Sequence, residues 1–280
     1  MSIIQLGLIG DNIARSRAPL LHQLAGRQAG LTVVYERLIP KDLGLDFDAT
    51  FARCAALGFR GVNVTYPYKE VAAAKVRIED PLVRRIGAVN TVVFSPDGPL
   101  GYNTDYSGFK AAWRDAMDSA RPGAVCLIGA GGVGKAVAFG LLGLGVQEIR
   151  LVDSDTAKAD ALARTLRATA PDAVIHVAPD AEHAAAGAEG LINCTPLGMV
   201  GHDGSALPRA MMRGAAWAFD AVYTPIDTQF LRDAADEGLK IISGYELFFH
   251  QGVDAWDIFV GRTLSHDDLR RALAAAPPDA

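Results

Sequence analysis

The first hundred residues alternate short apolar runs with segments of helical periodicity. This pattern predicts helices over 19–29 and 47–57, and strands over Ile3–Ile9, 33–39, Gly61–Val64, 91–94 and 100–102. Strand-helix alternation of this kind indicates a parallel sheet covered by helices. The last two strands are short, and Pro96-Asp97-Gly98-Pro99 between them has the composition of a turn.

A second alternating region follows a helical segment over 107–117 and the break at Arg121-Pro122-Gly123. Its predicted strands are Ala124–Ile128, Glu148–Val152, Val174–Val177, Gly190–Asn193, 216–220 and Lys240–Ile242. A last helix is expected over 245–260. We therefore expect an α/β protein of two domains, one formed by residues 1–106 with 240–280 and the other by 107–239.

The second domain carries a glycine motif at Gly129-Ala130-Gly131-Gly132-Val133-Gly134. The motif follows an apolar strand, opens a helix, and precedes a strand that ends in Asp153. This is the βαβ pattern of a Rossmann-type dinucleotide-binding domain. Gly129 permits the tight turn, Gly131 lets backbone N–H groups approach a diphosphate, and Gly134 lets the helix pack closely. The alternative is a glycine-rich turn that binds no ligand.

Asp153 bears on the choice of cofactor. A carboxylate at this position accepts hydrogen bonds from the ribose hydroxyls of NAD and repels the 2′-phosphate of NADP. The adjacent residues supply no arginine, although Lys158 is close in sequence. We predict NAD in preference to NADP, with the alternative that Asp153 caps the following helix.

Composition and charge narrow the class of protein. Half of the 280 residues are hydrophobic and the net charge is −5, which is typical of a globular protein without general affinity for nucleic acid or a membrane. Three separated cysteines (Cys54, Cys126 and Cys194) suit a reducing cytoplasm. The chain has neither a CxxC pair nor an HExxH pattern, so we expect no metal site. A monomer or a homodimer is expected.

Three polar segments of the first domain carry a family resemblance. Residues 63–70 match the pattern NVTxPxKE, residues 87–91 read GAVNT, and residues 103–105 read NTD. In the second domain GAGGxG matches at 129–134 and NxTPxGM at 193–199. With these ordered motifs the chain resembles the shikimate dehydrogenase family, which includes the quinate/shikimate dehydrogenases, over almost its whole length.

The resemblance implies an NAD(P)-dependent enzyme that oxidises or reduces a hydroxyl of a small cyclic carboxylate such as shikimate or quinate, with a catalytic cleft between its two domains. It assigns catalysis to Lys69 and Asp105. Lys69 would exchange the proton of the reacting hydroxyl, and Asp105 would orient Lys69 and hydrogen-bond the same hydroxyl. The residues that it assigns to the substrate are Ser16, Thr65, Asn90, Tyr223 and Gln251. Those that it adds on the cofactor side are Asn193, Thr195, Met199, Val222 and Gly244.

Simpler interpretations of the catalytic residues stay open. Lys69 would be a solvated residue at a helix start, and Asp105 would be the N-cap of the next helix. A further alternative is a non-catalytic NAD-binding sensor of the same fold. The presence of both Lys69 and Asp105 argues against it. A folate-type methylene dehydrogenase shares a similar two-domain plan, and the NTD motif together with Lys69 disfavours it.

The chain departs from the family where the substrate carboxylate is bound. The family segment I-x-H-S-x-S-P reads here Ile13-Ala14-Arg15-Ser16-Arg17-Ala18-Pro19, so that Ala18 replaces the second hydroxyl residue. A hydrogen bond to a charged group contributes about 1.5–3 kcal/mol. Arg15 or Arg17 would either compensate as a carboxylate partner or be a solvated loop residue. The chain also differs from the family pattern at Tyr66 and in the terminal segment Ser243-Gly244-Tyr245-Glu246-Leu247. These differences leave quinate, shikimate and an amino-substituted relative open as substrates.

Overall fold

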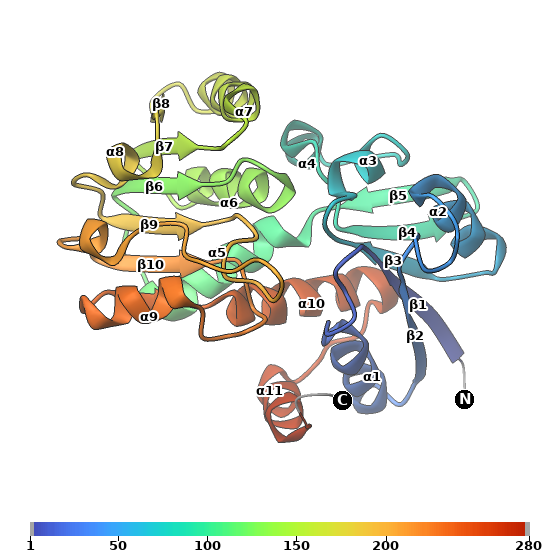
Figure 1. Cartoon of the computed structure of the whole chain (residues 1–280). Helices are drawn as coiled ribbons and strands as arrows, with labels where there is room; N and C mark the ends of the chain where they lie inside the picture. Colours follow the sequence, from blue (N-terminus) through green and yellow to red (C-terminus); the bar gives the residue numbers. More distant parts are fainter. Residues whose placement is uncertain (1–2, 278–280) are drawn as a thin grey trace. The chain divides into compact units, whose positions relative to one another are not determined.

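The computed structural model of the chain describes residues 3–277 and is shown in Figure 1. Its contacts divide the chain into two compact units, one formed by Met1–Thr104 with Gln251–Ala280 and the other by Asp105–His250. Each unit has its own sheet and its own apolar core. Within the described part of the chain, no helix combines the length and the apolar character that crossing a bilayer requires.

The first unit contains a five-stranded sheet in the order β2-β1-β3-β4-β5. Its strands are β1 (Ile3–Ile9), β2 (Thr32–Leu38), β3 (Gly61–Val64), β4 (Thr91–Ser95) and β5 (Gly98–Tyr102). The expected parallel pairing is confirmed for β1 with β2 and with β3. The two short strands predicted around the turn at residues 96–99 are β4 and β5, which form an antiparallel hairpin, and β4 pairs antiparallel with β3.

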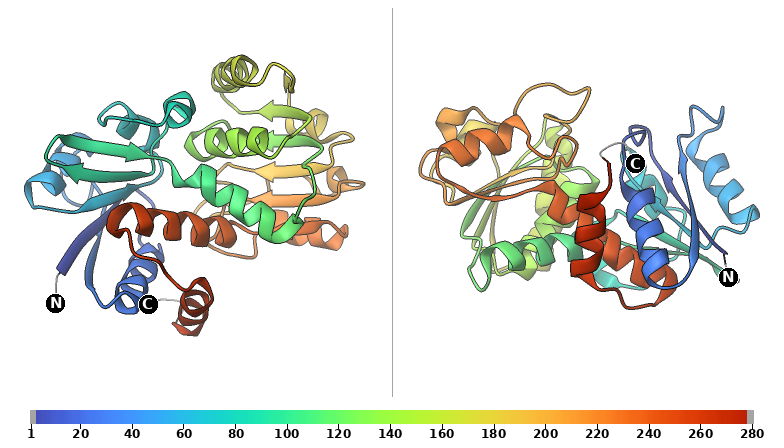
Figure 2. Two further views of the ribbon diagram at one scale, coloured as in Figure 1. Left: turned by 180° about the vertical axis from the view of Figure 1, so that it is seen from behind. Right: turned by 90° about the horizontal axis from the view of Figure 1, so that it is seen from below.

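Capping residues mark the ends of some of the helices of the first unit. They are α1 (Ala18–Gln28), α2 (Phe47–Ala56), α3 (Lys69–Ala73), α4 (Pro81–Ile86) and α11 (His266–Ala275). The Asp46 side chain accepts the Ala49 N–H at the start of α2, and Gly87 ends α4 in the left-handed conformation. Figure 2 shows α11 (red) beside α1 (blue), where the Arg17 guanidinium donates to the Leu273 carbonyl at 2.7 Å.

The second unit is a six-stranded parallel sheet in the order β8-β7-β6-β9-β10-β11 (Figure 1). The strands are β6 (Ala124–Ile128), β7 (Glu148–Val152), β8 (Val174–Val177), β9 (Gly190–Asn193), β10 (Trp217–Asp220) and β11 (Lys240–Ile242). Its helices include α5 (Thr104–Met117), α6 (Gly132–Gly143), α7 (Thr156–Thr169), α8 (Ala181–Ala185) and α9 (Gln229–Asp236). This strand order is that of the Rossmann fold, and β6 and β9 flank its topological switch point.

The return of the chain to the first unit falls later than the sequence indicated. Residues 240–250 were expected in the first domain, but β11 pairs in parallel with β10 and so extends the sheet of the second unit. The division instead falls within α10 (Gly244–Val260), between His250 and Gln251. The other crossing point lies at the start of α5, between Thr104 and Asp105.

Candidate functional site

The glycine motif forms the turn from β6 into α6. Gly129 has a φ of +104°, and a Cβ there would lie 2.7 Å from the Cys194 backbone carbonyl. A Cβ at Gly134 would lie 1.9 Å from the carbonyl oxygen of Gly129. A Cβ at Gly131, the N-cap of α6, would meet no protein atom within 4 Å. The first and last glycines are thus required by the fold, whereas the absence of a side chain at Gly131 leaves the N-terminus of α6 open to a ligand.

The Asp153 carboxylate lies against this turn from the end of β7. One oxygen accepts the Ala130 backbone N–H at 2.7 Å and the other accepts the Asp155 N–H at 2.9 Å. The side chain that caps α7 is that of Asp155, which accepts the Ala157 N–H at 3.1 Å. The alternative that Asp153 caps the helix is therefore wrong. Lys158 lies exposed in the first turn of α7.

A buried polar group joins the ends of β9 and β10, and it combines the predicted residues Asn193 and Thr195 with two further side chains. Asn193 accepts the N–H and the hydroxyl of Thr195 at 2.9 and 2.7 Å through its carbonyl oxygen, and its amide donates to Asp220 at 3.0 Å. Asp220 also accepts the Val222 N–H at 2.9 Å and the Thr228 hydroxyl at 2.6 Å. Asp220 and Thr228 belong to no motif that we had identified, although the carboxyl end of a parallel strand is where a ligand-facing acid is expected.

Burial controls the ionisation of this acid. The side chain of Asp220 is fully buried, and loss of hydration raises its pKa to about 6 against the opposing effect of its three hydrogen-bond donors. The Asp220 carboxylate therefore holds the loops that follow β9 and β10 through hydrogen bonds. These hydrogen bonds change in strength when the pH passes the pKa of Asp220, which is about 6.

The remaining residues predicted on the cofactor side lie in those same loops, except Gly244, which begins α10 (Gly244–Val260). Val222 is buried, and its carbonyl oxygen would lie 2.5 Å from a Cβ at Gly244, so only glycine fits at the start of α10. Met199 lies in the turn after Thr195 and accepts the His202 N–H at 2.8 Å. Tyr223, predicted to contact the substrate, stacks on Phe248 of α10 with ring centroids 4.9 Å apart.

In the first unit a group of amide and hydroxyl side chains meets at the ends of the β4–β5 hairpin. The side-chain oxygen Oδ1 of Asn90 accepts the Thr104 N–H at 2.8 Å and the Thr91 hydroxyl at 3.1 Å. The Asn90 amide donates to the Thr104 hydroxyl at 2.9 Å and to the Gln251 carbonyl oxygen at 3.5 Å. The structure thus brings together Asn90 and Gln251, two of the predicted substrate residues that lie 161 positions apart.

A second layer of side chains orients this group from inside the unit. Tyr35 donates its hydroxyl to the Asn63 carbonyl oxygen at 2.9 Å, and the Asn63 amide donates to Thr91 at 3.1 Å. The ring of His22 stacks on that of Tyr35 with centroids 5.0 Å apart, and burial lowers the pKa of His22 to about 3. His22 is therefore a neutral core residue at ordinary pH, and the amide of Asn63 has a fixed orientation.

The two predicted catalytic residues are both buried. Lys69 begins α3 with 7% of its surface exposed, so the interpretation of a solvated lysine is wrong. Asp105 is 4% exposed and is the second residue of α5, which excludes it as the N-cap. Lys69 belongs to the first unit and Asp105 begins the second. Thr65 lies in the turn between β3 and α3, where its N–H donates to the Ile9 carbonyl at 2.9 Å.

The segment before α1 holds the departures from the family pattern. Ser16 is buried, and its hydroxyl oxygen accepts the Ala18 N–H at 3.3 Å. Arg15 is exposed, whereas Arg17 is half-buried and bonded to α11 through Leu273. Arg17 therefore has a structural partner within the first unit, and of the two arginines it is Arg15 that lies exposed in the loop.

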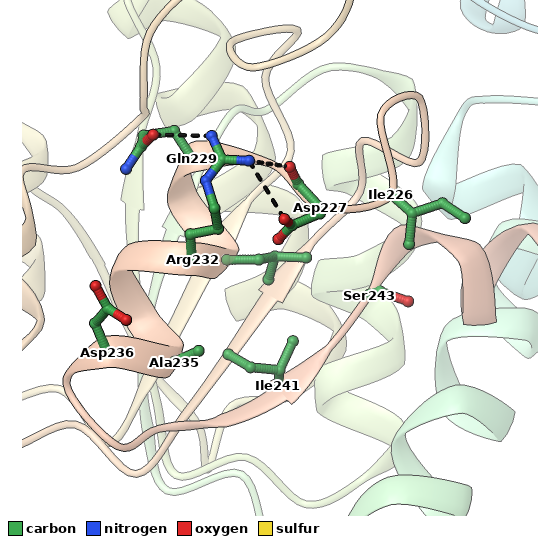
Figure 3. Close-up of a pocket in the computed structure, with 9 residues that line it drawn as sticks. Ile226, Asp227, Gln229, Arg232, Ala235, Asp236, Ile241 and Ser243 are labelled. Carbon is green, nitrogen blue, oxygen red and sulfur yellow. Dashed lines mark hydrogen bonds and ion pairs between the residues drawn. The ribbon is translucent and has the colours of Figure 1, made fainter.

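A surface hollow of about 590 Å³ lies on the second unit between α9 and β11 (Figure 3). None of the predicted site residues lines it. The Arg232 guanidinium on its wall donates to the Asp227 carbonyl at 2.6 Å and to Gln229 at 2.9 Å. This cation is already held by its neighbours, so the hollow has little to offer an anionic ligand.

Taken individually, the two units define a class of protein. The second unit has the strand order, glycine turn and acidic residue of a Rossmann-type dinucleotide-binding domain. The sequence model described as "Shikimate dehydrogenase substrate binding domain" matches residues 8–92 in the first unit. A model of the ThiF family matches residues 102–190, which include the glycine turn.

Comparison with known proteins identifies the family. The chain is 37% identical to a quinate/shikimate dehydrogenase (NAD(+)) of Corynebacterium efficiens, covering 92% of this chain and 93% of that protein. It is 36% identical to a shikimate dehydrogenase (NADP(+)) of Pseudarthrobacter chlorophenolicus, covering 95% and 92%. The solved structure of quinate dehydrogenase from Corynebacterium glutamicum in complex with NAD matches with a TM-score of 0.87 at 34% identity, covering 98% of this chain and all of that one. The chain belongs to the shikimate/quinate dehydrogenase family.

Proposed function

We propose that this chain is an NAD-preferring dehydrogenase that interconverts quinate or shikimate, or a close ring analogue, with the corresponding 3-dehydro ketone. Relatives named as quinate/shikimate and shikimate dehydrogenases cover more than nine-tenths of the chain. An aminoshikimate-type dehydrogenase is the alternative within the same chemistry.

The observation that carries this proposal is the hydrogen-bonded group formed by Asn90, Thr104 and Gln251. A polyhydroxylated ring needs several donors and acceptors held in fixed directions, because an unmatched polar group in a closed site is costly. The Asn90 carbonyl is occupied by Thr104 and Thr91, which directs its amide toward Gln251. This amide and the side chain of Gln251 would bind the ring hydroxyls, with Thr65 and Tyr223 as further contacts and Ser16 at the carboxylate.

We assign the proton transfer to Lys69 and Asp105. Oxidation of the secondary alcohol breaks one C–H bond and one O–H bond, and bound NAD supplies the hydride acceptor. In the oxidative direction the Lys69 amine would accept the proton of the reacting hydroxyl, and in the reductive direction the resulting ammonium group would return that proton to the carbonyl oxygen. Asp105 would accept a hydrogen bond from the same hydroxyl and orient the lysine. The burial of both side chains supports these roles, because an ion in a dry site interacts more strongly with its partners.

The preference for NAD rests on Asp153. Its two oxygens are fixed by the N–H groups of Ala130 and Asp155, and each retains a lone pair for a ribose hydroxyl. A 2′-phosphate beside this carboxylate would meet a like charge. The glycine turn of residues 129–134, together with Asn193, Thr195, Met199, Val222 and Gly244, would line the diphosphate and nicotinamide portions. An enzyme that uses NAD fits the oxidative, catabolic direction, because NAD pools are usually oxidised.

The choice of ring acid rests on the start of α1. Ala18 places a methyl group where the family carries a hydroxyl, which removes one donor from the carboxylate of shikimate. Loss of such a bond weakens binding by about tenfold to a hundredfold. Quinate carries an additional ring hydroxyl, so it depends less on this single contact, and we favour quinate over shikimate.

The test is a panel of shikimate, quinate and aminoshikimate assayed with NAD and with NADP by the absorbance of the reduced cofactor. We expect turnover of at least one ring acid, with a larger kcat/KM for NAD than for NADP. Binding of NAD without turnover of any member of the panel would favour a sensor and would overturn the assignment of an enzyme.

A further inference from the structure

Within the second unit, α5 and the first part of α10 bring together three side chains that the dehydrogenase chemistry does not use. Asp115 lies near the end of α5, and Glu246 and His250 lie on α10. One ligand atom of each of the three lies within 4.8 Å of those of the other two. Figure 2 (left) shows the two helices, α5 in green and α10 in red, close together.

The arrangement has the features of a cation site. Glu246 and His250 are four residues apart, so they project from the same face of α10. The His250 ring is almost buried and presents its Nε2 atom 2.9 Å from a carboxylate oxygen of Asp115. The Asp115 side chain is 59% exposed, which gives an ion access from solvent. Ligand atoms around a tetrahedral Zn²⁺ ion lie about 3.4 Å apart. Small rotations of the two carboxylates would reach that spacing.

The local charge favours a cation at this point. With a neutral imidazole the three groups carry two negative charges. Asp115 is also two residues from Met117, the last residue of α5, and the carbonyl end of a helix disfavours a negative charge. A divalent ion between the three groups would neutralise both carboxylates and the negative end of the helix.

We propose that Asp115, Glu246 and His250 bind one divalent transition-metal ion of the Zn²⁺ type, with water in the remaining coordination position. One imidazole and two carboxylates suit Zn²⁺ and its neighbours in the transition series, whereas Mg²⁺ and Ca²⁺ prefer oxygen ligands alone. The ion would join α5 to α10 within the second unit and act on its stability. The motifs of the chain predicted no metal site, because these three ligands come from two helices more than 120 positions apart and make no local pattern.

The experiment is a calorimetric titration of Zn²⁺ into the untagged full chain after treatment with a chelator. We expect one site per chain, and we expect Co²⁺ bound in its place to give visible absorption bands of a low-symmetry complex. A saturating concentration of Zn²⁺ should raise the Tm by roughly 5 °C. Substitutions Glu246→Gln and Asp115→Asn preserve size and should each weaken binding at least about tenfold, as loss of a ligand does.

The matched control is His183→Ala. His183 and Asp180 form a similar pair, with the ring Nδ1 2.8 Å from the carboxylate, but they belong to no described group of three ligands. Zn²⁺ affinity should be unchanged in this variant and lost in His250→Ala. The proposal is overturned if the full chain binds no Zn²⁺ at about 100 µM free ion, well above the dissociation constants of structural zinc sites. It is also overturned if Glu246→Gln and Asp115→Asn bind the ion as tightly as the unchanged chain.

Discussion

Substitution of Asp153 by alanine should reverse much of the proposed preference for NAD. The carboxylate is fixed between two backbone N–H groups at 2.7 and 2.9 Å, so it is in place before the cofactor arrives. Loss of one hydrogen bond to a charged acceptor costs about 1.5–3 kcal/mol, which lowers kcat/KM for NAD by about tenfold to 150-fold.

The same substitution should improve the use of NADP. Two unit charges about 4 Å apart repel by about 1 kcal/mol in water and by about 4 kcal/mol at an effective dielectric constant of 20. Because Asp153 is only partly buried, we take the lower figure, which corresponds to a gain of about fivefold. The ratio of kcat/KM for NAD to that for NADP should therefore fall by about 50-fold or more.

The measurement is the initial rate of ring-acid oxidation at varied concentrations of each cofactor. Asp155→Ala is the matched control, since this neighbouring carboxylate caps α7 through the Ala157 N–H. It should lower stability by about 1 kcal/mol and leave the cofactor ratio unchanged. A ratio for Asp153→Ala within threefold of the original would refute the reasoning and place the discrimination on another residue.

Three further substitutions test the site and its support. Lys69→Met keeps most of the side-chain volume and should lower kcat by orders of magnitude, while the affinity for NAD in a fluorescence titration stays unchanged. The control Lys75→Met should leave kcat unaltered. A near-normal kcat for Lys69→Met would remove Lys69 from the mechanism. Ala18→Ser should lower KM for shikimate by about tenfold in steady-state assays, and an unchanged KM would mean that the carboxylate is bound elsewhere. The pKa of Asp220 in the folded chain is about 6, which lies above its value in the unfolded chain. As pH falls from about 6 to 4, the folded chain therefore binds a proton that the unfolded chain does not, and the free energy of unfolding rises. Denaturant unfolding should show the stability of the unchanged chain relative to Asp220→Asn rising by about 2 kcal/mol from pH 6.5 to 4, and a constant difference would contradict the buried carboxylate.

Much of the fold was predictable because strand positions follow from local apolar runs. The strands Ile3–Ile9, Gly61–Val64 and Lys240–Ile242 have the predicted bounds. The pairing partners were less predictable, since they depend on contacts between distant segments. Residue Lys240 looked like the start of a return to the first domain, yet hydrogen bonding to β10 keeps it in the second. The short helix α4 was missed, although Asp80, Pro81 and Gly87 supply its start and end signals.

The candidate site was predictable as far as its residues lie in motifs. Asn90 and Gln251 were singled out by resemblance, and the structure adds that they share a hydrogen bond. Asp220 and Thr228 could not be found in this way. Their importance comes from burial and from partners up to 27 positions away, and neither property is visible in a local pattern.

The β4–β5 hairpin has a consequence for how this family can vary. Ser95 pairs with Gly98, so only Pro96 and Asp97 form its tip, and Thr91 pairs with Tyr102 at the other end. A slip of one residue at that tip would turn every following side chain to the opposite face and carry Thr104 away from Asn90. Natural variation in this hairpin should therefore preserve the register of its strands even where the residues at the tip are replaced, because the length of this small exposed turn determines whether Thr104 can reach Asn90.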